Sequence, residues 1–233
     1  MSGGLAGKTA VVTGTAHGIG AAIADALRAD GAAVHGVDKD SVDLTDAAGV
    51  REFFARIGGV DILVNNAGGV CGQTGHPLEE VSEDDWHQVV DANLTTAFLC
   101  TRAVVPAMKE HRWGRIVNIS SAAGLGVSKT GIQAYASAKA AQIGFTRQMA
   151  HELGPFGVTV NCIAPGFIRS NPTTERQWES YGPQGQRDLL RGIAMRRLGE
   201  PADIANGVRF FVAERSSWVT GQTLAIDGGD ALL

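Results

Sequence analysis

The chain has 233 residues, of which 44% are hydrophobic and 19% are charged, a composition typical of a globular α/β protein that folds as one domain. Its formal net charge of -4 argues against nucleic acid or an anionic membrane as the main partner. The sequence lacks a secretory leader and an apolar stretch of about 18 residues, so we expect a cytoplasmic protein without membrane contact.

The cysteines and histidines point to neither a disulfide framework nor a metal site. The three cysteines are widely spaced and include no CxxC pair (Cys71, Cys100 and Cys162), so we expect reduced thiols. The six histidines form no HxH or HxxxH pair, which would leave a metal ion without its usual ligands.

Short β-branched runs alternate along the chain with longer segments of helical periodicity. The expected strands are residues 9–13, 33–37, 62–65, 115–120, 159–163 and 223–226, and the expected helices are residues 21–29, 83–111, 134–153 and 201–214. Continuously apolar strands joined by helices form parallel sheets that are covered on both faces. We therefore expect residues 1–233 to form a single doubly wound, Rossmann-type α/β domain with a mostly parallel, seven-stranded sheet.

One connection in this pattern is short. After the second strand, only four residues separate Asp38 from Asp43 and Leu44, whereas a crossover connection with its helix needs about ten residues or more. We therefore expect the helix after the second strand to be missing or reduced to a turn.

The segment VTGTAHGIG places Gly14, Gly18 and Gly20 between a buried strand and an alanine-rich helix. Three glycines at this spacing are expected by chance in a chain with 31 glycines, so the context carries the interpretation. At a strand-to-helix turn, free N–H groups and the positive end of the helix dipole favour a pyrophosphate, which glycines allow to approach the backbone. The turn therefore predicts a dinucleotide site.

The next strand ends at Asp38, 18 residues beyond Gly20. This is near the ~20-residue offset at which an acidic residue receives the ribose 2′-hydroxyl of NAD, and a carboxylate there repels the 2′-phosphate of NADP. Residues 15–17 contain no Arg or Lys that could hold that phosphate. We expect NAD as the cofactor, and NADP, which Lys39 could favour, is the less favoured alternative.

A second constellation lies further along the chain, where YASAK places Tyr135 and Lys139 on one face of a helix. A lysine cation beside a phenol lowers the pKa of the tyrosine, which makes it usable as an acid or base. Ser121 ends a strand 14 residues earlier, and NNAG ends another at Asn65–Gly68. Because parallel strands end at one edge of their sheet, we expect these groups to converge on the glycine turn.

Residues 168–195 are expected to form a substrate lid. The stretch 169–186 (RSNPTTERQWESYGPQGQ) is polar, contains proline and carries aromatic side chains. A long irregular segment within a compact domain is more often functional than a linker.

The chain resembles the short-chain dehydrogenase/reductase family over essentially its whole length. The resemblance rests on seven ordered motifs: TGTAHGIG, NNAG, DANLTTAF, IVNISS, YASAK, VNCIAPG and VTGQTLAIDGG. The family's TGxxxGxG pattern is matched at Thr13, Gly14, Gly18 and Gly20. It implies a dinucleotide-dependent oxidoreductase that interconverts a secondary alcohol and a ketone by hydride transfer.

The same resemblance implies a role for each matched residue. Tyr135 would move the hydroxyl proton, and Ser121 would hydrogen-bond the substrate oxygen. Lys139 would hold the nicotinamide ribose and lower the pKa of Tyr135, and Asn93 would keep a water relay through a kink in its helix. Besides Tyr135 and Lys139, the cofactor would contact Gly14, His17, Gly18, Ile19, Gly20, Asp38, Asp43, Leu44, Asn66, Ala67, Gly68, Pro165, Gly166, Ile168 and Ser170.

The substrate is less well defined by the sequence. Its expected contacts are Ser121, Gln133, Tyr135, Arg169 and Trp178. Basic groups on the lid and on the loop before Tyr135, among them Lys129, could hold an anionic group, although such groups are more often simply solvated. We expect a small polar secondary alcohol or its ketone, with an anionic substituent as one option.

Two other functions stay open. One is a 3-oxoacyl-acyl-carrier-protein-type ketoreductase, because Arg112 stands where such enzymes keep a basic docking residue, although Phe156 replaces a second one. The other is a non-catalytic dinucleotide-binding or interaction protein, against which the retained serine, tyrosine and lysine count.

The two long helical segments, 83–111 and 134–153, carry more apolar residues than one core face needs: Phe98, Leu99, Val104, Ile143, Phe145 and Met149. In the family these helices pair across a dimer, and the tail near residues 227–233 helps to form tetramers. We therefore expect a homotetramer or homodimer, and ordinary core packing is the alternative for these side chains.

Overall fold

The computed structural model describes residues 4–128 and 130–231, and its strands form one parallel sheet. The strands are β1 (Thr9–Thr13), β2 (Ala33–Val37), β3 (Ile62–Asn65), β4 (Gly114–Ile119), β5 (Val158–Pro165) and β6 (Thr223–Ile226). They lie in the order β2-β1-β3-β4-β5-β6, and every neighbouring pair is parallel. The expected doubly wound α/β fold is confirmed.

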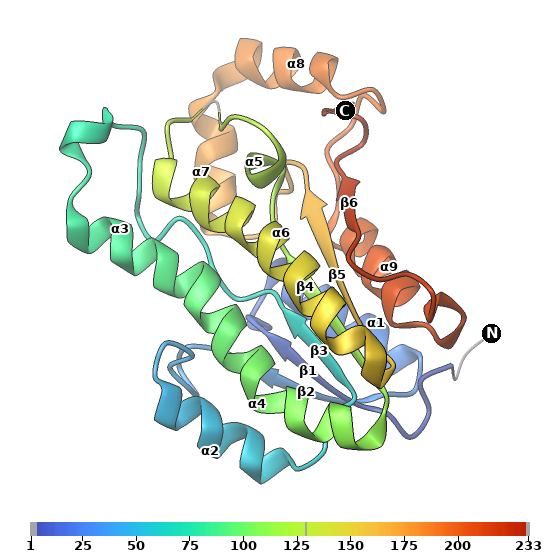
Figure 1. Ribbon diagram of the computed structural model, residues 1–233. Helices are drawn as coiled ribbons and strands as arrows, with labels where there is room; N and C mark the ends of the chain where they lie inside the picture. Colours follow the sequence, from blue (N-terminus) through green and yellow to red (C-terminus); the bar gives the residue numbers. More distant parts are fainter. Residues whose placement is uncertain (1–3, 129, 232–233) are drawn as a thin grey trace.

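Helices cover both faces of the sheet (Figure 1). On one face lie α1 (Gly18–Ala29) and α9 (Pro201–Val212), and on the other lie α2 (Ala47–Ile57), α4 (Thr96–His111) and α6 (Gln133–Leu153). Successive strand residues point to opposite faces, so Ala10 and Val12 pack under α1 while Val11 packs under α2 and α4. Because both faces are covered, the central strands β1, β3, β4 and β5 are buried and mostly apolar, whereas the edge strand β2 is largely exposed.

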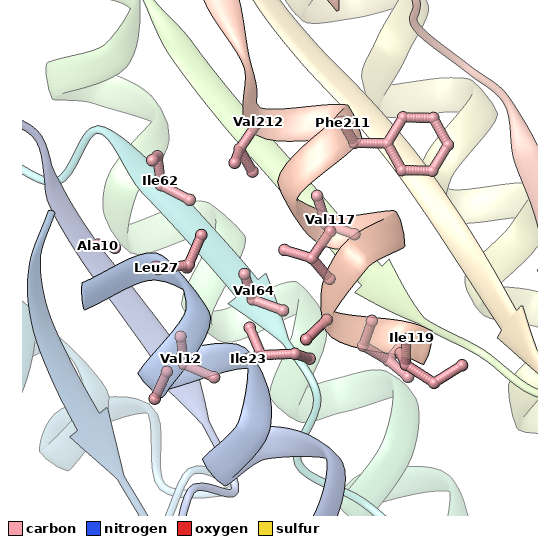
Figure 2. Close-up of a cluster of buried hydrophobic side chains, with 14 of the residues drawn as sticks. Ala10, Val12, Ile23, Leu27, Ile62, Val64, Val117, Ile119, Phe211 and Val212 are labelled. Atoms are coloured by element: carbon pink, nitrogen blue, oxygen red, sulfur yellow. The ribbon is translucent and has the colours of Figure 1, made fainter. Parts of the chain in front are cut away.

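Figure 2 shows the core between the sheet and the helices α1 and α9. Ile23 and Leu27 of α1 lie over β1 and β3, and the ring of Phe211 of α9 extends toward β5. Phe211 is 2% exposed, whereas the ring of its neighbour Phe210 remains 46% exposed. The buried side chains of α1 and α9, among them Ile23, Leu27 and Phe211, therefore hold these two helices on this face of the sheet.

The sheet differs from the expectation by one strand. In the part of the chain that the structure describes it has six strands rather than seven, and these six lie where the apolar runs of the sequence placed them. Asp43 uses its carboxylate to accept hydrogen bonds from Thr45, at 2.9 Å from the backbone N and 2.7 Å from Oγ1. Residues 43–46 thus form a local turn between β2 and α2.

The connection from β2 to β3 also differs from the expectation. No helix follows Asp38 directly, since Ser41 N donates to the carbonyl of Asp38 in a turn (2.9 Å). A complete crossover helix, α2, nevertheless follows, so the prediction of a missing helix was wrong for this connection. Asp46 starts α2 by accepting hydrogen bonds from Ala48 N and Gly49 N, both at 3.0 Å.

The expected helix over residues 83–111 forms as three consecutive elements. It begins as α3 (Glu83–Val90), continues through a π-helical turn, η2 (Asp91–Thr95), and ends as α4. The turn contains Asn93, whose side chain donates to the carbonyl of Val89 (2.7 Å). The kink that the resemblance implied is therefore a π-bulge, which inserts one extra residue into the helix.

The expected lid is more regular than the sequence indicated. Residues 172–192 form two helices, α7 (Pro172–Ser180) and α8 (Gly182–Gly192), which lie beyond the carboxyl end of β5 (Figure 1). Asn171 caps α7 by accepting from Thr173 N (2.9 Å) and Thr174 N (3.0 Å). The remaining short helices are η1 (Leu78–Glu80), α5 (Ala122–Leu125), η3 (Gly154–Phe156) and η4 (Glu214–Ser216).

The apolar residues singled out on the two long helices mostly belong to the core. Leu99, Val104 and Ile143 are buried within the chain, whereas Phe98 is 42% exposed. Among the helices of the described ranges, none is long and apolar enough to cross a membrane.

The two adjacent phenylalanines of α9 offer a matched test of this packing. We expect Phe211→Ala to lower the free energy of unfolding by about 3–5 kcal/mol, because it leaves a cavity against the sheet. Phe210→Ala removes a half-exposed ring, so its loss is expected to be about 1 kcal/mol or less. Urea denaturation of both variants measures the difference, and equal losses would contradict the described packing.

Candidate active site

The candidate site lies at the carboxyl edge of the sheet, where the strand order reverses. The chain passes from β1 to β2 on one side, and β3 begins the series that continues to β6 on the other. In doubly wound folds the crevice beyond such a switch point binds the ligand. Thr13 of β1 and Asn65 of β3 end at this crevice, and the segments that follow them carry the candidate groups.

The turn from β1 into α1 leaves no space for side chains at its glycines. Gly14 and Gly18 have positive φ angles of 74° and 62°, and a Cβ on Gly20 would lie 1.9 Å from the carbonyl oxygen of Gly14. His17, at the N-cap, makes no side-chain hydrogen bond, so the first N–H groups of α1, which include that of Ile19, are open to an anion. This cradle fits the pyrophosphate of a nicotinamide dinucleotide.

Thr13 connects the glycine turn to the NNAG segment. Its Oγ1 accepts hydrogen bonds from Asn66 N (3.0 Å) and Ala67 N (2.8 Å). The side chain of Asn66 in turn donates to the carbonyls of Thr13 (2.9 Å) and Gly14 (3.1 Å). These contacts fix the two loops that flank the crevice relative to each other.

Asp38 closes the other side of the same crevice. Its Oδ2 accepts from both the backbone N and Oγ1 of Thr15, each at 2.9 Å. The carboxylate is thereby held at the tip of β2, beside the glycine turn. Thr15 is a residue that the sequence analysis did not single out, although it lies within the glycine motif.

The remaining predicted cofactor residues surround this crevice at different depths. A Cβ on Gly68 would lie 2.4 Å from Oδ1 of Asn93, and one on Gly18 would lie 2.5 Å from the carbonyl of Ser170. Ser170 therefore reaches the glycine turn from the segment after β5, which also contains Gly166 and Ile168, and Pro165 is the last residue of β5. Asp43 is exposed, whereas Leu44 is buried in the core with Val11, so its side chain is not available to a ligand.

Ser121, Tyr135 and Lys139 meet at the ends of β4 and α6. Ser121 caps α5 by accepting from Ala123 N (3.2 Å), and its side chain lies close enough to Tyr135 to lower the pKa of the phenol. Lys139 Nζ lies 5.6 Å from the centroid of the Tyr135 ring and donates to the carbonyl of Ile119 at 2.8 Å. Ser121, Tyr135 and Lys139 therefore lie close together at the carboxyl edge of the sheet.

Burial shifts the pKa of both titratable residues in this cluster. It lowers the pKa of Lys139 to about 8, an effect that the nearby Cys162 thiol opposes. It raises the pKa of Tyr135, and the hydrogen bond with Ser121 counteracts that rise. The direction for Tyr135 is opposite to the expected one, because desolvation of the phenolate outweighs the neighbouring groups in the free protein.

Asn93 connects the π turn to the NNAG loop. Its Nδ2 donates to the carbonyl of Gly69 (2.8 Å) and its Oδ1 accepts from Gly69 N (3.1 Å). Its backbone carbonyl accepts from Nε2 of Gln142 at 2.8 Å. Gln142 was missed from the sequence, where the available signal was an amide three residues after Lys139 in an otherwise apolar stretch.

A loop between β3 and η1 lies against the start of α6. Gln73 Oε1 accepts from Tyr135 N (3.3 Å), and Gln133 Nε2 donates to the carbonyl of His76 (2.7 Å). The other amide atoms, Nε2 of Gln73 and Oε1 of Gln133, are buried and have no hydrogen-bond partner among the described residues. Gln73 therefore lies beside Tyr135, as does Gln133, which the sequence analysis expected to contact the substrate.

Arg169 and Trp178 are held by neighbours within the lid. Arg169 makes two-pronged contact with Glu175, with 2.7 Å between Nη2 and Oε2, and its guanidinium lies 5.5 Å from the Trp178 ring. Trp178 also stacks on Phe167, with 6.3 Å between ring centroids. The charge of Arg169 is therefore already paired with the carboxylate of Glu175. Lys129, the other basic residue considered for an anionic substrate, lies outside the described residues.

Two shallow hollows occur near this edge, and neither contains the cluster of Ser121, Tyr135 and Lys139. One of about 250 Å³ is lined by Gly126, Val127, Ser128, Gly131, Ile132, Gln133, Ala136 and Ser137. The other, of about 320 Å³, lies over Arg169, Glu175 and Leu198–Pro201.

The cysteines and acidic residues suggest no further centre. Cys100 and Cys162 are buried free thiols, and burial raises the pKa of Cys162 to about 11, so the thiol is protonated at neutral pH. Cys71 is free and exposed. Within residues 4–128 and 130–231, no group of three His, Cys, Asp or Glu side chains could hold a metal ion.

Comparison with known proteins identifies related sequences over nearly the whole chain. The family described as enoyl-(acyl carrier protein) reductase matches residues 40–230. The (2S)-((R)-hydroxy(phenyl)methyl)succinyl-CoA dehydrogenase subunit BbsD of Thauera aromatica is 38% identical, with 98% of both chains covered. The 3-oxoacyl-(acyl-carrier-protein) reductase FabG of Vibrio cholerae serotype O1 is 35% identical, with 97% of this chain and 98% of the relative covered.

Solved structures give the same result. A putative gluconate dehydrogenase from Agrobacterium tumefaciens has a TM-score of 0.88 at 30% identity, covering 98% of both chains. A structure described as ribose-5-phosphate isomerase from Brucella melitensis 16M has a TM-score of 0.89 at 34% identity, covering 99% of this chain and 94% of that one. The chain belongs to the short-chain dehydrogenase/reductase family and is an oxidoreductase of the dehydrogenase/ketoreductase class that uses a nicotinamide dinucleotide.

Proposed function

We propose that the protein is an NAD-preferring cytoplasmic dehydrogenase that interconverts a small polar secondary alcohol and its ketone. The observation that supports this proposal is the meeting of Ser121, Tyr135 and Lys139 at the edge of the sheet that also carries the glycine turn. When bound, the dinucleotide supplies the acceptor or donor of the hydride. The chain itself supplies the groups that bind the oxygen and move its proton.

Tyr135 is the proposed general base for alcohol oxidation and the general acid for ketone reduction. Its phenolate takes the hydroxyl proton as the carbinol carbon loses hydride, and Ser121 hydrogen-bonds the same oxygen as its charge changes. The Lys139 cation offsets the cost of forming a phenolate in a buried site. This role explains why a tyrosine whose pKa is raised by burial lies next to a buried lysine.

Asp38 supports the preference for NAD. Its carboxylate is held at the tip of β2 by Thr15, so a negative charge stands where a 2′-phosphate would have to bind. Only one carboxylate oxygen, Oδ2, is used in these contacts. Oδ1 can therefore accept a hydrogen bond from a ribose hydroxyl.

The unpaired amide atoms beside Tyr135 support a polar substrate. Gln73 Nε2 is a donor and Gln133 Oε1 is an acceptor, and leaving either of them buried without a partner is costly. A substrate with a hydroxyl or carboxyl group next to the reacting carbon would satisfy them. Gluconate, after which the similar dehydrogenase of Agrobacterium tumefaciens is named, has this chemistry. The ion pair of Arg169 with Glu175 argues against a substrate held by Arg169 alone.

Reduction of a 3-oxoacyl thioester is the second candidate, because FabG proteins are among the relatives. The chain gives limited support for docking an acyl carrier protein through Arg112. Arg112 donates to the carbonyl of Pro155 (2.9 Å) and precedes β4, so a strand of six residues, about 20 Å long, separates it from Ser121. Parallel assays with polyols, hydroxy acids and an acetoacetyl thioester distinguish the two candidates.

We also infer a homotetramer or homodimer. Large apolar side chains remain exposed on α4 (Phe98), on α9 (Phe210) and on β6 with the segment before it (Leu224 and Trp218). Trp218 is 97% exposed, which is unusual for an indole in a monomer. Light scattering measures the assembly directly.

The chain contains only two tyrosines, which allows a matched test of the proposed base. Tyr135→Phe is expected to lower kcat for alcohol oxidation at least about a thousandfold, because it removes the proton acceptor, while NAD still binds. Tyr181→Phe, which loses only a hydrogen bond from Gln177, is expected to keep kcat within about threefold. Turnover by Tyr135→Phe within tenfold of the wild type would exclude the proposed role.

A second prediction concerns the cofactor. Asp38→Asn removes the charge but keeps an oxygen that can accept from Thr15, so we expect the ratio of kcat/KM for NAD over NADP to fall about tenfold or more. Asp40→Asn, an exposed change in the same turn, is the control and should leave the ratio unchanged. An unaltered ratio in Asp38→Asn would mean that another group selects the cofactor.

A further inference from the structure

Gln142 is a fully buried amide whose two ends are both used. It lies on α6 one turn after Lys139, and it is 0% exposed. Its Nε2 donates to the backbone carbonyl of Asn93 in the π turn (2.8 Å), and its Oε1 accepts from Nζ of Lys139 (3.2 Å). The side chain thus forms a direct bridge between the bulge in the long helix and the lysine of the site.

Packing alone does not account for an amide at this position. Apart from Lys139 and Thr146, the other buried side chains of α6 are apolar, among them Ala138, Ile143 and Leu153. Burying an amide costs free energy unless its donor and acceptor are satisfied, and an apolar side chain of similar volume would avoid that cost. The two contacts of Gln142 therefore indicate a role that is exerted on Lys139.

The ammonium of Lys139 has three N–H donors. One binds the carbonyl of Ile119 at the end of β4, and a second binds Gln142 Oε1. The titratable groups that face it are Tyr135 from α6 and the Cys162 thiol from β5, and neither is a carboxylate. The charged form of Lys139 is thus stabilised by two neutral oxygens, and one donor is left for the site.

We propose that Gln142 is a positioning residue that keeps Lys139 charged and directs its remaining N–H into the site. This inference rests on the proposed role of Lys139. An amide has a fixed donor end and a fixed acceptor end, so its bond to Asn93 determines which atom faces the lysine. The backbone carbonyl of Asn93 in the π turn thereby orients Gln142, and Gln142 in turn orients the ammonium group of Lys139 on α6.

The ionisation of Lys139 can be measured without cofactor, substrate or turnover. The chain has five lysines, so ¹³C-labelled lysine gives a small set of NMR signals, and Lys139→Arg identifies the signal of interest. Gln142→Met keeps the volume but removes the acceptor, and the pKa of Lys139 is expected to fall by about one unit or more. Gln142→Glu adds a carboxylate and is expected to raise that pKa.

Gln148→Met is the matched control, because Gln148 is exposed on the same helix; it should leave the pKa unchanged. Opposite shifts in the Met and Glu variants support the proposal, since a general loosening of the site would move both the same way. Shifts in one direction, or no shift in a variant that melts at the wild-type temperature, overturn it. If Gln142→Met does not fold, a pKa in Gln142→Glu that fails to rise is sufficient to overturn it.

The same variants separate this inference from the proposed function. If Tyr135→Phe remains active but the pKa of Lys139 moves as expected, the catalytic role of Tyr135 is wrong and the positioning role of Gln142 is supported. If the pKa of Lys139 does not move while Tyr135→Phe is inactive, the positioning role of Gln142 is wrong and the catalytic role of Tyr135 is supported.

Discussion

The close approach of α1 to the end of β1 is the constraint on which the site depends. A single methyl group on Gly20 would overlap the carbonyl of Gly14, so the helix can begin at this place only where side chains are absent. Once the helix starts there, its free N–H groups face the crevice between β1 and β3. Thr13 then binds the loop after β3, and Asp38 is held from the other side through Thr15.

The part of the candidate site that contains Tyr135 is held by buried polar contacts that run through the interior of the fold. Asn65 of β3 donates to Asn118 of β4 (2.8 Å), and Asn118 donates to Thr146 of α6 (2.9 Å). Thr146 in turn donates to the backbone carbonyl of Gln142 (2.8 Å). A polar network of this kind is costly unless its members are paired, so it favours one arrangement of α6 on the sheet. The position of Tyr135 follows from that arrangement.

The features that could be predicted from sequence are those carried by local patterns. Continuous apolar runs located the strands, and the i, i+4 spacing placed Tyr135 and Lys139 on one face. The start of α2 at Asp46 was missed because its cap follows an irregular segment, and the expected seventh strand corresponds to no apolar run of the sequence and to no strand of the described residues. The partner of Arg169 could not be predicted, since Glu175 approaches it only after α7 has formed. The contact of Gln142 could not be predicted either, because its partner is the backbone carbonyl of Asn93, which lies in a different helical segment.

The π turn at Asn93 has a consequence for the geometry of the whole edge. Each residue of a helix advances the direction of its side chain by about 100°, so one extra residue rotates α3, and the chain that leads into it, relative to α4. Deleting that residue would give a more regular helix with better hydrogen bonding. It would also turn α3 and withdraw the carbonyl that Gln142 binds. At Asn93, a regular α-helix would therefore remove a contact that the candidate site uses, so helix stability and the geometry of the site are opposed.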